Sequence, residues 1–476
     1  MIHDLIRYPE MKDSGVPWLG EVPKHWDVPR LGSLLRERGE TNDRNFVTEV
    51  LSVTRDRGVI PYAEKGNIGN KKSDDITRYK IVRPDDIVVN CMNVIIGSVG
   101  LSKYTGCLSP VYYVLTRRSD DNLPSYLDAY FQTKPFQLSL VRIGNGILAH
   151  RMRIPMELLK CEPFPRPPAA EQAAIVQYLD YMDRHIGHYV RCKQKLIKLL
   201  DEQKIAIIRN AVTRGRDLNV QRKSSNISWI DDIPVHWDVR KARSLFRMQG
   251  SGTTPNADRY YGGGVPWVMS GDLNDSQIVA TKRDVTRNAV EEISTLRLYP
   301  QGSLVVAMYG ATIGKTGILG IAACTNQACC VLADPTSDAN VAFMQFAFQV
   351  ARQHLLHLGY GGGQPNINAE IVKSLRLPCP PRAEQDEIVQ FIDGQCKSLD
   401  AAVGQAKVEI SLLHEYRNRL TADVVTGKFD VRAAVAGLPN EINQEEMALD
   451  EMEPFSEDGL ENDDSDLESS SVEVET

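Results

Sequence analysis

The run of residues from Pro167 to about Gly215 most constrains how this chain can fold. Two prolines end whatever precedes it, and the following stretch holds no further proline and, before Gly215, only one glycine, Gly187. Apolar or long side chains recur at steps of three and four, or at sevens made from them, which places one stripe along a helix. At ~1.5 Å per residue, about 44 residues form a rod that cannot close a core alone. We therefore expect a partner helix. The stripe comprises Ile175, Leu179, Met182, Ile186, Val190, Ile197, Leu200, Ile207 and Ala211.

The expected partner is a second copy of the pattern, 213 residues downstream. Two prolines again precede Ala-Glu-Gln, now ending at Gln385, and a second stripe follows. Two unrelated amphipathic helices are the alternative, which the repeated start string disfavours. The polar interruptions Lys193 and Lys204 face Ala406 and Arg417 at matching positions, where they either set the register or mark a seam that frays toward solvent. The second stripe comprises Ile388, Ile392, Leu399, Val403, Ile410, Leu413, Leu420 and Val424.

A second repeat marks the start of each half of the chain. Residues 14–28 read SGVPWLGEVPKHWDV and residues 225–239 read SNISWIDDIPVHWDV. The His-Trp-Asp string invites a catalytic interpretation, but no nucleophile lies at a fixed distance from either histidine. We favour aromatic anchors and a proline turn that dock each domain start on its own helix. The repeated positions are Trp18, Pro23, His25, Trp26 and Asp27, matched by Trp229, Pro234, His236, Trp237 and Asp238.

Composition places the chain among globular proteins of two to four domains, with 476 residues, 42% of them hydrophobic and 25% charged. The nine scattered cysteines form no CxxC pair, which indicates reduced structural thiols in a cytoplasm. The N-terminus has no apolar core, so we expect no signal peptide. The apolar stretch 304–324 is broken by four glycines and contains Lys315, so we expect two buried strands and a turn rather than a membrane span.

The net charge of −7 hides a basic body. Residues 440–476 contain fifteen Asp or Glu and no Lys or Arg, so the first 439 residues carry a net charge of +8. A mildly basic body suits a polyanion partner, although an ordinary surface is also compatible with it. The acidic, serine-rich tail cannot bury enough apolar surface to fold, and we expect it to be disordered.

Between each anchor and each long helix lies a block of about 130 to 150 residues with strand-like runs. The runs are Ile87–Asn90, Val94–Ile96 and Val111–Leu115 in the first block, and Leu304–Met308 and Cys329–Leu332 in the second. Each block then turns helical, at Leu123–Phe136 and Asn340–Leu358. Each closes through a loop, 144–153 or 359–368, into an extended segment and the prolines. The blocks differ in most residues, so the order is variable domain, helix, variable domain, helix.

These features together resemble the specificity subunit of type I restriction–modification systems. The resemblance rests on PKHWDV and PVHWDV, on the two PPxAEQ helix starts, and on YKIVRPDDIVVN and TGCLSPVYYVL in the first half. In the second half it rests on SGTTPNADRYYGGGVPWVMSGDL, GATIGKTG and GGGQPNIN. It covers roughly residues 14–432, and the combination is highly specific. The acidic tail departs from the family pattern.

The resemblance implies an α+β fold with a pseudo-two-fold internal repeat. Two mixed α/β target-recognition domains would be joined by two long antiparallel helices that form a coiled-coil spacer. We predict recognition domains at 1–162 and 217–376, spacer helices at 163–216 and 377–439, and the tail at 440–476.

The partners that the resemblance implies are double-stranded DNA, two methyltransferase subunits and restriction subunits, with no membrane. The chain itself is expected to hold no cofactor and no metal. S-adenosylmethionine, ATP and magnesium would belong to the partner subunits.

The sequence shows no catalytic motif of its own. GATIGKT at residues 310–316 has three residues between its glycines where a phosphate-binding loop needs four. The Asn-Pro-Pro-aromatic string of adenine methyltransferases is absent, and no carboxylate cluster with a lysine suggests a nuclease. We therefore predict a non-catalytic subunit. The alternatives are an enzyme with an unrecognised site, and a coiled-coil scaffold that does not bind DNA.

DNA reading then falls to cationic and amide side chains on loops, which position phosphates and contact base edges. For any single one of these, a solvated surface group is the competing interpretation. The helix starts are predicted to contact the methyltransferase, weighed evenly against simple stabilisation of the helix N-terminus. The DNA-binding candidates are Lys71, Lys72, Arg78, Asn93, His150 and Arg151 in the first block, and Thr254, Arg259, Tyr309, Lys315, Gln327 and Gln364 in the second. The partner-binding candidates are Glu171, Gln172, Glu384 and Gln385.

Overall fold

The computed structural model describes residues 5–55, 57–66, 71–146, 152–217, 219–360 and 365–438. The candidates His150, Arg151 and Gln364 lie outside the described residues, as does the predicted acidic tail. The chain divides into two compact units. Unit 1 combines Met1–Lys193 with Val408–Thr476, and unit 2 is Gln194–Lys407. The two units cut across the predicted segments, because each long helix contributes one end to each unit.

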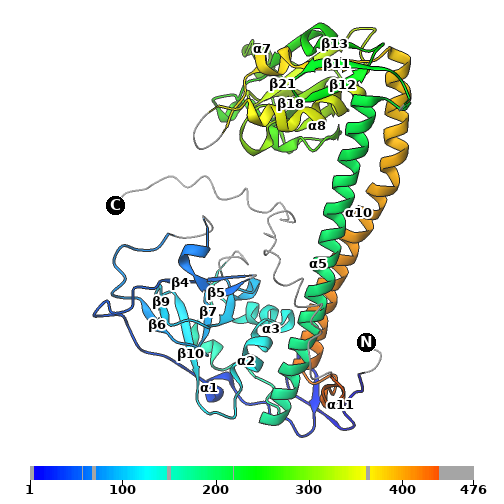
Figure 1. The fold of residues 1–476 in the computed structure, drawn as a ribbon. Helices are drawn as coiled ribbons and strands as arrows, with labels where there is room; N and C mark the ends of the chain where they lie inside the picture. The colour runs from blue at the N-terminus through cyan, green and yellow to red at the C-terminus, as the bar shows by residue number, and fades with distance from the viewer. Residues whose placement is uncertain are drawn as a thin grey trace. The chain divides into compact units, whose positions relative to one another are not determined.

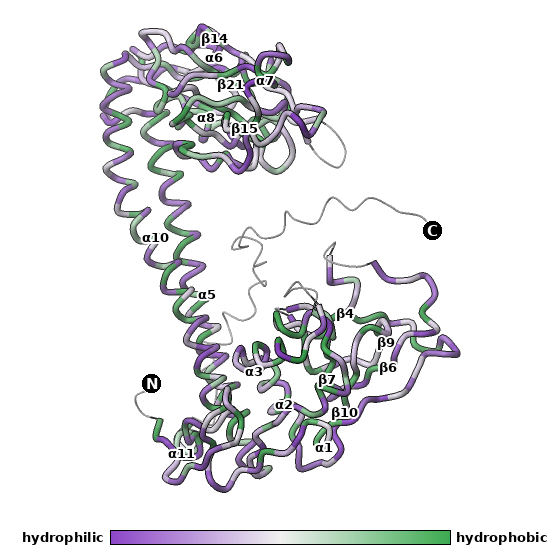
Figure 2. Tube along the Cα trace, turned by 180° about the vertical axis from the view of Figure 1, so that it is seen from behind, coloured by the Kyte–Doolittle hydropathy of each residue, from purple (hydrophilic) through white to green (hydrophobic). Residues whose placement is uncertain are grey.

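The two long helices form where the sequence predicts them. Helix α5 spans Ala169–Arg214 and helix α10 spans Arg382–Val425 (Figure 1). Hydrophobic and hydrophilic residues alternate along both (Figure 2), as expected of helices that bury one side. Both ends of each stripe are buried. The middle residues, Ile197 and Leu200 in α5 and Val403 in α10, are half-buried. They lie outside the two hydrophobic clusters in which the helices pack against the cores.

Within each unit the start of one long helix packs against the end of the other. In unit 1, Asp183 pairs with Arg417 at 3.0 Å, and Lys193 pairs with Glu409. In unit 2, Lys204 pairs with Asp400 at 2.6 Å. The expectation that Lys204 faces Arg417 is therefore wrong, since Lys204 pairs with Asp400 and Arg417 with Asp183. The expectation that Lys193 faces Ala406 stays a prediction. Because the packed segments run antiparallel, positions away from the middle of each helix do not meet their counterparts in the other copy.

Unit 1 is built on a four-stranded antiparallel sheet with the order β3-β10-β7-β8. Helices α2 and α3 cover this sheet through a core of aromatic rings that includes Tyr130, Phe131 and Phe136. Three separate two-stranded sheets, β1/β2, β4/β5 and β6/β9, complete the strands of unit 1. The strands are β1 (Met11–Asp13), β2 (Glu21–Pro23), β3 (Leu35–Glu37), β4 (Leu51–Thr54), β5 (Gly58–Pro61), β6 (Lys80–Val82), β7 (Ile87–Asn90), β8 (Val99–Leu101), β9 (Gly106–Leu108) and β10 (Tyr112–Arg117); the short helices are α1 (Leu31–Leu34), α2 (Pro124–Phe131), α3 (Lys134–Ser139), α4 (Met156–Leu159) and α11 (Arg432–Ala436).

Unit 2 is built on a five-stranded sheet with the order β14-β21-β18-β19-β16, in which only the β16–β19 pair is parallel. A three-stranded sheet, β17-β15-β20, and the ladders β11/β12 and β13/β22 accompany it. The strands are β11 (Arg222–Ile227), β12 (Ile230–Pro234), β13 (Asp238–Lys241), β14 (Phe246–Ser251), β15 (Tyr261–Val268), β16 (Ser276–Ile278), β17 (Arg283–Val285), β18 (Leu304–Ala307), β19 (Thr316–Leu319), β20 (Cys324–Thr325), β21 (Cys329–Pro335) and β22 (Arg376–Cys379); the helices are α6 (Ala242–Leu245), α7 (Arg287–Glu292), α8 (Val341–His357) and α9 (Ala369–Ser374).

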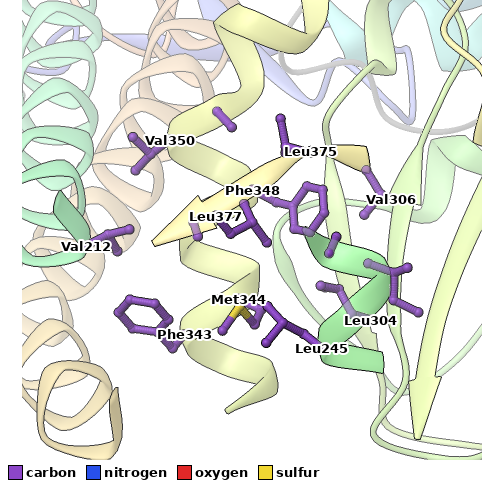
Figure 3. Packing of buried hydrophobic residues seen from close by; sticks show 14 of the residues in the cluster. Val212, Leu245, Leu304, Val306, Phe343, Met344, Phe348, Val350, Leu375 and Leu377 are labelled. Carbon is purple, nitrogen blue, oxygen red and sulfur yellow. The ribbon is translucent and has the colours of Figure 1, made fainter. Parts of the chain in front are cut away.

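The core of unit 2 lies between its large sheet and the long helices. Phe343 and Phe348 of α8 pack in one cluster with Leu304 of β18 and Val212 of α5 (Figure 3). Asn340 caps α8, since its side chain accepts hydrogen bonds from the backbone N–H groups of Ala342 and Phe343. Helix α8 thus fixes the sheet to the end of α5, and the loops at the strand ends remain at the surface.

Most of the expected short elements form, with two differences. Val94–Ile96 is a 3-10 turn rather than a strand. The helix expected over Leu123–Phe136 is split into α2 and α3, because Pro135 fits the first turn of a new helix, where no N–H is needed. The stretch 304–324 forms strands around a single 3-10 turn, as expected. Within the described residues, no helix is long and apolar enough to cross a membrane.

Candidate nucleic-acid interface

In unit 1 the start of α5 binds the anchor motif through one buried carboxylate. Glu171 is 4% exposed and accepts a hydrogen bond from Trp26 Nε1 at 3.0 Å, and its second oxygen lies 2.8 Å from His25 Nε2. The Tyr8 hydroxyl also donates to Glu171. Burial and the neighbouring carboxylate raise the pKa of Tyr8. Arg432 covers the Tyr8 ring at 5.5 Å, so the carboxylate is sealed from solvent.

The same arrangement recurs at the start of α10 in unit 2. Glu384 accepts from Trp237 Nε1 at 3.1 Å, and its other oxygen lies 2.8 Å from His236 Nε2. No tyrosine hydroxyl donates to it among the described residues, and 28% of the Glu384 side chain is exposed. The expectation that the His-Trp motifs dock each domain start on its own helix is confirmed by these contacts.

The glutamines that follow the glutamates bind the start of an earlier, shorter helix in the same unit. Gln172 accepts from the backbone N–H of Leu123 at 2.8 Å and donates to the Pro167 carbonyl at 2.9 Å. Gln385 accepts from the backbone N–H of Asn340 at 2.8 Å and donates to the Pro380 carbonyl at 2.9 Å. These amides join each long helix to the N-cap residue of α2 or α8.

Three of the four partner-binding candidates, Glu171, Gln172 and Gln385, are thus buried and hydrogen-bonded inside their own units. Glu384 retains partial exposure. Their contact with a methyltransferase subunit remains a prediction, and their internal role is the one that the contacts support directly.

In unit 2 the structure brings four DNA-binding candidates to one end of the five-stranded sheet. Thr254 follows β14, Gln327 precedes β21, Tyr309 follows β18 and Lys315 precedes β19. Since neighbouring strands in this order are antiparallel, the end of one strand lies beside the start of the next. The backbone N–H of Met308 also bonds the Ala328 carbonyl at 2.8 Å, so the residues that follow β18 lie beside the turn that precedes β21. This sheet end, residues 252–254, 308–315 and 325–328, is called the loop end below.

A further loop joins the loop end through the backbone. Tyr309 forms an antiparallel bridge with Asn366, and the Gly310 N–H bonds the Pro365 carbonyl at 2.9 Å. Gln364 directly precedes these residues but lies outside the described ones. Arg259 lies apart from this group, in a 3-10 turn before β15, where it contacts the Tyr260 hydroxyl and Glu292.

The candidates of unit 1 fall into two groups. Lys71, Lys72 and Arg78 are exposed on the segment between β5 and β6. The backbone N–H of Lys72 donates to the Tyr62 hydroxyl at 3.0 Å, and its ammonium lies 5.9 Å from the centre of that ring. Asn93 follows β7, at the sheet end that corresponds to the loop end of unit 2.

Two residues at these strand ends were not among the candidates. Arg153 is exposed and bridges Asn145, and the next residue, Ile154, donates its N–H to the Cys91 carbonyl after β7. Asn366 bridges Tyr309 and Tyr360. Both lie next to glycine-containing loops, and that position was the only signal available in the sequence.

The described residues hold no metal-ligand cluster, and several of their cysteines are buried. No group of three or more His, Cys, Asp or Glu side chains among them could hold a metal ion. Burial raises the pKa of Cys324 to about 11 and that of Cys330 to about 12, which makes these thiols poor nucleophiles.

Comparison with known proteins shows which proteins this chain resembles. Residues 234–404 match the model of the type I restriction modification DNA specificity domain. A putative type I restriction enzyme MjaX specificity subunit from Methanocaldococcus jannaschii is 23% identical over 432 residues, which cover 87% of this chain and 96% of that protein. Over most of its length the chain is thus similar to specificity subunits of type I restriction enzymes.

Other comparisons with this family agree. The type I restriction enzyme MjaVIII specificity subunit of the same archaeon is 23% identical, over 86% of this chain and 94% of that one. A chain solved in a study of complex assembly and conformational transition of the type I R-M system shares the fold. Its TM-score is 0.60 at 14% identity, over 85% of this chain and 98% of the solved one.

Proposed function

We propose that this chain is the DNA-recognition subunit of a type I restriction–modification complex, in which each unit reads one part of a two-part target. The observation that carries the proposal is the gathering of Thr254, Tyr309, Lys315 and Gln327 at the loop end of unit 2. Hydroxyl, amide, aromatic and cationic groups side by side suit contacts with base edges and phosphates. The two blocks differ in sequence, so the two parts of the target should differ.

The long helices have a separate role in this proposal. We infer that α5 and α10 form a coiled-coil spacer, that the helices and anchors repeat with pseudo-two-fold symmetry, and that helix length sets the gap between the two parts of the target. The matched contacts of Glu171 and Glu384 support the repeat, because each helix start is held by the same residue types.

The partners follow from the repeat. A methyltransferase subunit that recognises one helix start should also recognise the other, which gives two methyltransferase chains per specificity chain. Restriction subunits complete the nuclease. In this proposal S-adenosylmethionine, ATP and magnesium bind the partner subunits, while this chain contributes recognition and no catalysis.

Mapping of methylated adenines tests the proposal. The chain, co-expressed with the methyltransferase encoded beside it, should direct methylation to one interrupted, asymmetric sequence. Methylation without sequence preference by the assembled complex would contradict it, as would assembly without any DNA crosslink to this chain. The second outcome would favour a coiled-coil scaffold that does not bind DNA.

A further inference from the structure

Two exposed side chains at the loop end of unit 2 are already joined to each other. The Thr254 hydroxyl donates a hydrogen bond to Oε1 of Gln327, from the neighbouring turn. Both residues are exposed, and Gln327 Nε2 has no hydrogen-bond partner among the described residues. A surface glutamine ordinarily samples many rotamers, so a fixed partner on its oxygen indicates that its amide is held in one orientation.

The backbone beneath this pair is also fixed. The Thr253 N–H bonds the Thr325 carbonyl at 3.0 Å, and the Thr253 carbonyl accepts from Trp267 Nε1 at 3.3 Å. Gly252 lies so close to the turn that an added Cβ would fall 1.6 Å from the Thr325 carbonyl oxygen. The loop that carries Thr254 therefore packs directly on the turn that carries Gln327.

The turn itself is held from within. Asn326 Oδ1 accepts from the backbone N–H of Ala328 at 3.1 Å, and the Asn326 N–H bonds the Val268 carbonyl at 3.0 Å. Gln327 thus stands at the tip of a turn whose neighbours on both sides are fixed. Such a side chain can contact a ligand with little loss of conformational entropy.

From this geometry we propose that Thr254 and Gln327 act together as a base-reading pair that selects a guanine in the part of the target bound by unit 2. The inference rests on the proposed function and adds to it the identity of one base. Thr254 is the positioning residue, and Gln327 is the residue that contacts the base.

The selection follows from which atoms of the amide remain available. A free glutamine reads adenine with both ends of its amide, since Oε1 accepts from N6 and Nε2 donates to N7. When Oε1 accepts from the Thr254 hydroxyl, one of its two lone pairs is occupied and the oxygen is turned toward Thr254, so the two hydrogens of Nε2 are the part of the amide that faces the groove. Guanine presents two acceptors, N7 and O6, to such a donor pair, whereas adenine presents one acceptor and a donor.

The test compares methylation rates of the assembled complex on a randomised duplex library. Gln327→Ala should reduce discrimination at one guanine position by roughly 10-fold and leave the other positions unchanged. Thr254→Val should release Oε1 and raise acceptance of adenine at that same position by a similar factor. Gln301→Ala is the matched control, because Gln301 is exposed before the start of β18, at the opposite end of that strand from Tyr309.

The outcomes separate this inference from the function on which it rests. If the unmodified complex shows no sequence preference, the proposed function fails. If it does show one, three results overturn the base-reading pair alone: no change at any position in Gln327→Ala, an equal loss on all duplexes, or a selected base other than guanine. An equal loss would indicate a phosphate contact. Retained preference in the other part of the target shows that each variant is folded.

Discussion

The matched carboxylates at the two helix starts allow the effect of burial on stability to be compared within one protein. Glu171 and Glu384 each accept from a tryptophan and lie 2.8 Å from a histidine nitrogen. Only Glu171 is also bound by a buried tyrosine, and its side chain is 4% exposed against 28% for Glu384. Any favourable interaction with the helix N-terminus is common to both and cancels in the comparison.

Replacement of each glutamate by alanine should therefore cost different amounts. Glu171→Ala leaves the Trp26 and Tyr8 donors buried without an acceptor, which should lower the stability of the start of α5 by about 3–5 kcal/mol. Glu384→Ala should cost the start of α10 about 1–2 kcal/mol, because Glu384 is itself partly exposed and water can take its place beside Trp237 and His236. The difference of about 2–3 kcal/mol corresponds to a factor of roughly 30 to 150 in an opening equilibrium.

Hydrogen–deuterium exchange of the full-length chain can measure both values, since it reports opening in the first turns of α5 and α10 separately. Glu202→Ala, an exposed position on α5, serves as the control and should change protection little. Equal losses at the two helix starts, or a larger loss for Glu384→Ala, would refute the argument that sealing by Tyr8 and Arg432 strengthens the cluster of unit 1.

Three further predictions concern pH, spacing and the tail. Burial raises the pKa of Asp128 in α2 to about 6, and its Oδ1 has no hydrogen-bond partner within the described part of the chain. The folded state thus binds this proton more tightly than the unfolded state, and stability falls as pH rises from about 4 to about 6. Asp128→Asn should stabilise unit 1 by about 2 kcal/mol near pH 7.5 and give no gain near pH 4, as measured by thermal unfolding; a gain that does not depend on pH would contradict this cause. Seven-residue insertions after both Lys193 and Ala406 lengthen each helix by ~10.5 Å, which matches about three base pairs of DNA. Methylation mapping should show both parts of the target retained, a longer gap and weaker activity, because the DNA also rotates over that distance, whereas an unchanged gap with full activity would mean that the helices do not set the spacing. Truncation after Leu438 should leave the methylated sequence unchanged, and altered sites would give the acidic tail a recognition role.

The sequence predicted the helices and anchors well because repetition supplied a second, independent signal. Two stripes of the same period and two copies of His-Trp made α5, α10 and the docking of each anchor predictable. The sequence did not predict which residues of the two helices contact each other. The resemblance implied antiparallel helices, but placing Lys204 opposite Arg417 followed the repeat alignment, and only the structure shows Asp400 opposite Lys204.

The residue types of the candidate site could be predicted from the sequence, but their arrangement at one end of the sheet could not. Thr254, Tyr309 and Gln327 are separated by tens of residues, and the strand order β14-β21-β18 that unites them depends on long-range pairing. No local pattern encodes that order. The role of Tyr8 was likewise invisible, since its position in the second half, Asn219, carries no matching side chain.

Unit 1 is assembled from the two ends of the chain, which has a consequence for folding during synthesis. Its core needs Leu420, Val424 and Val431 beside residues from the first third of the chain, and the Asp430 N–H bonds the Ile6 carbonyl at 2.8 Å. Unit 2 uses one continuous stretch, Gln194–Lys407. During synthesis, unit 2 can therefore close before unit 1, although unit 1 begins to emerge first. The early part of unit 1 must wait for more than two hundred residues with apolar surface uncovered, a state in which nascent chains bind chaperones or aggregate.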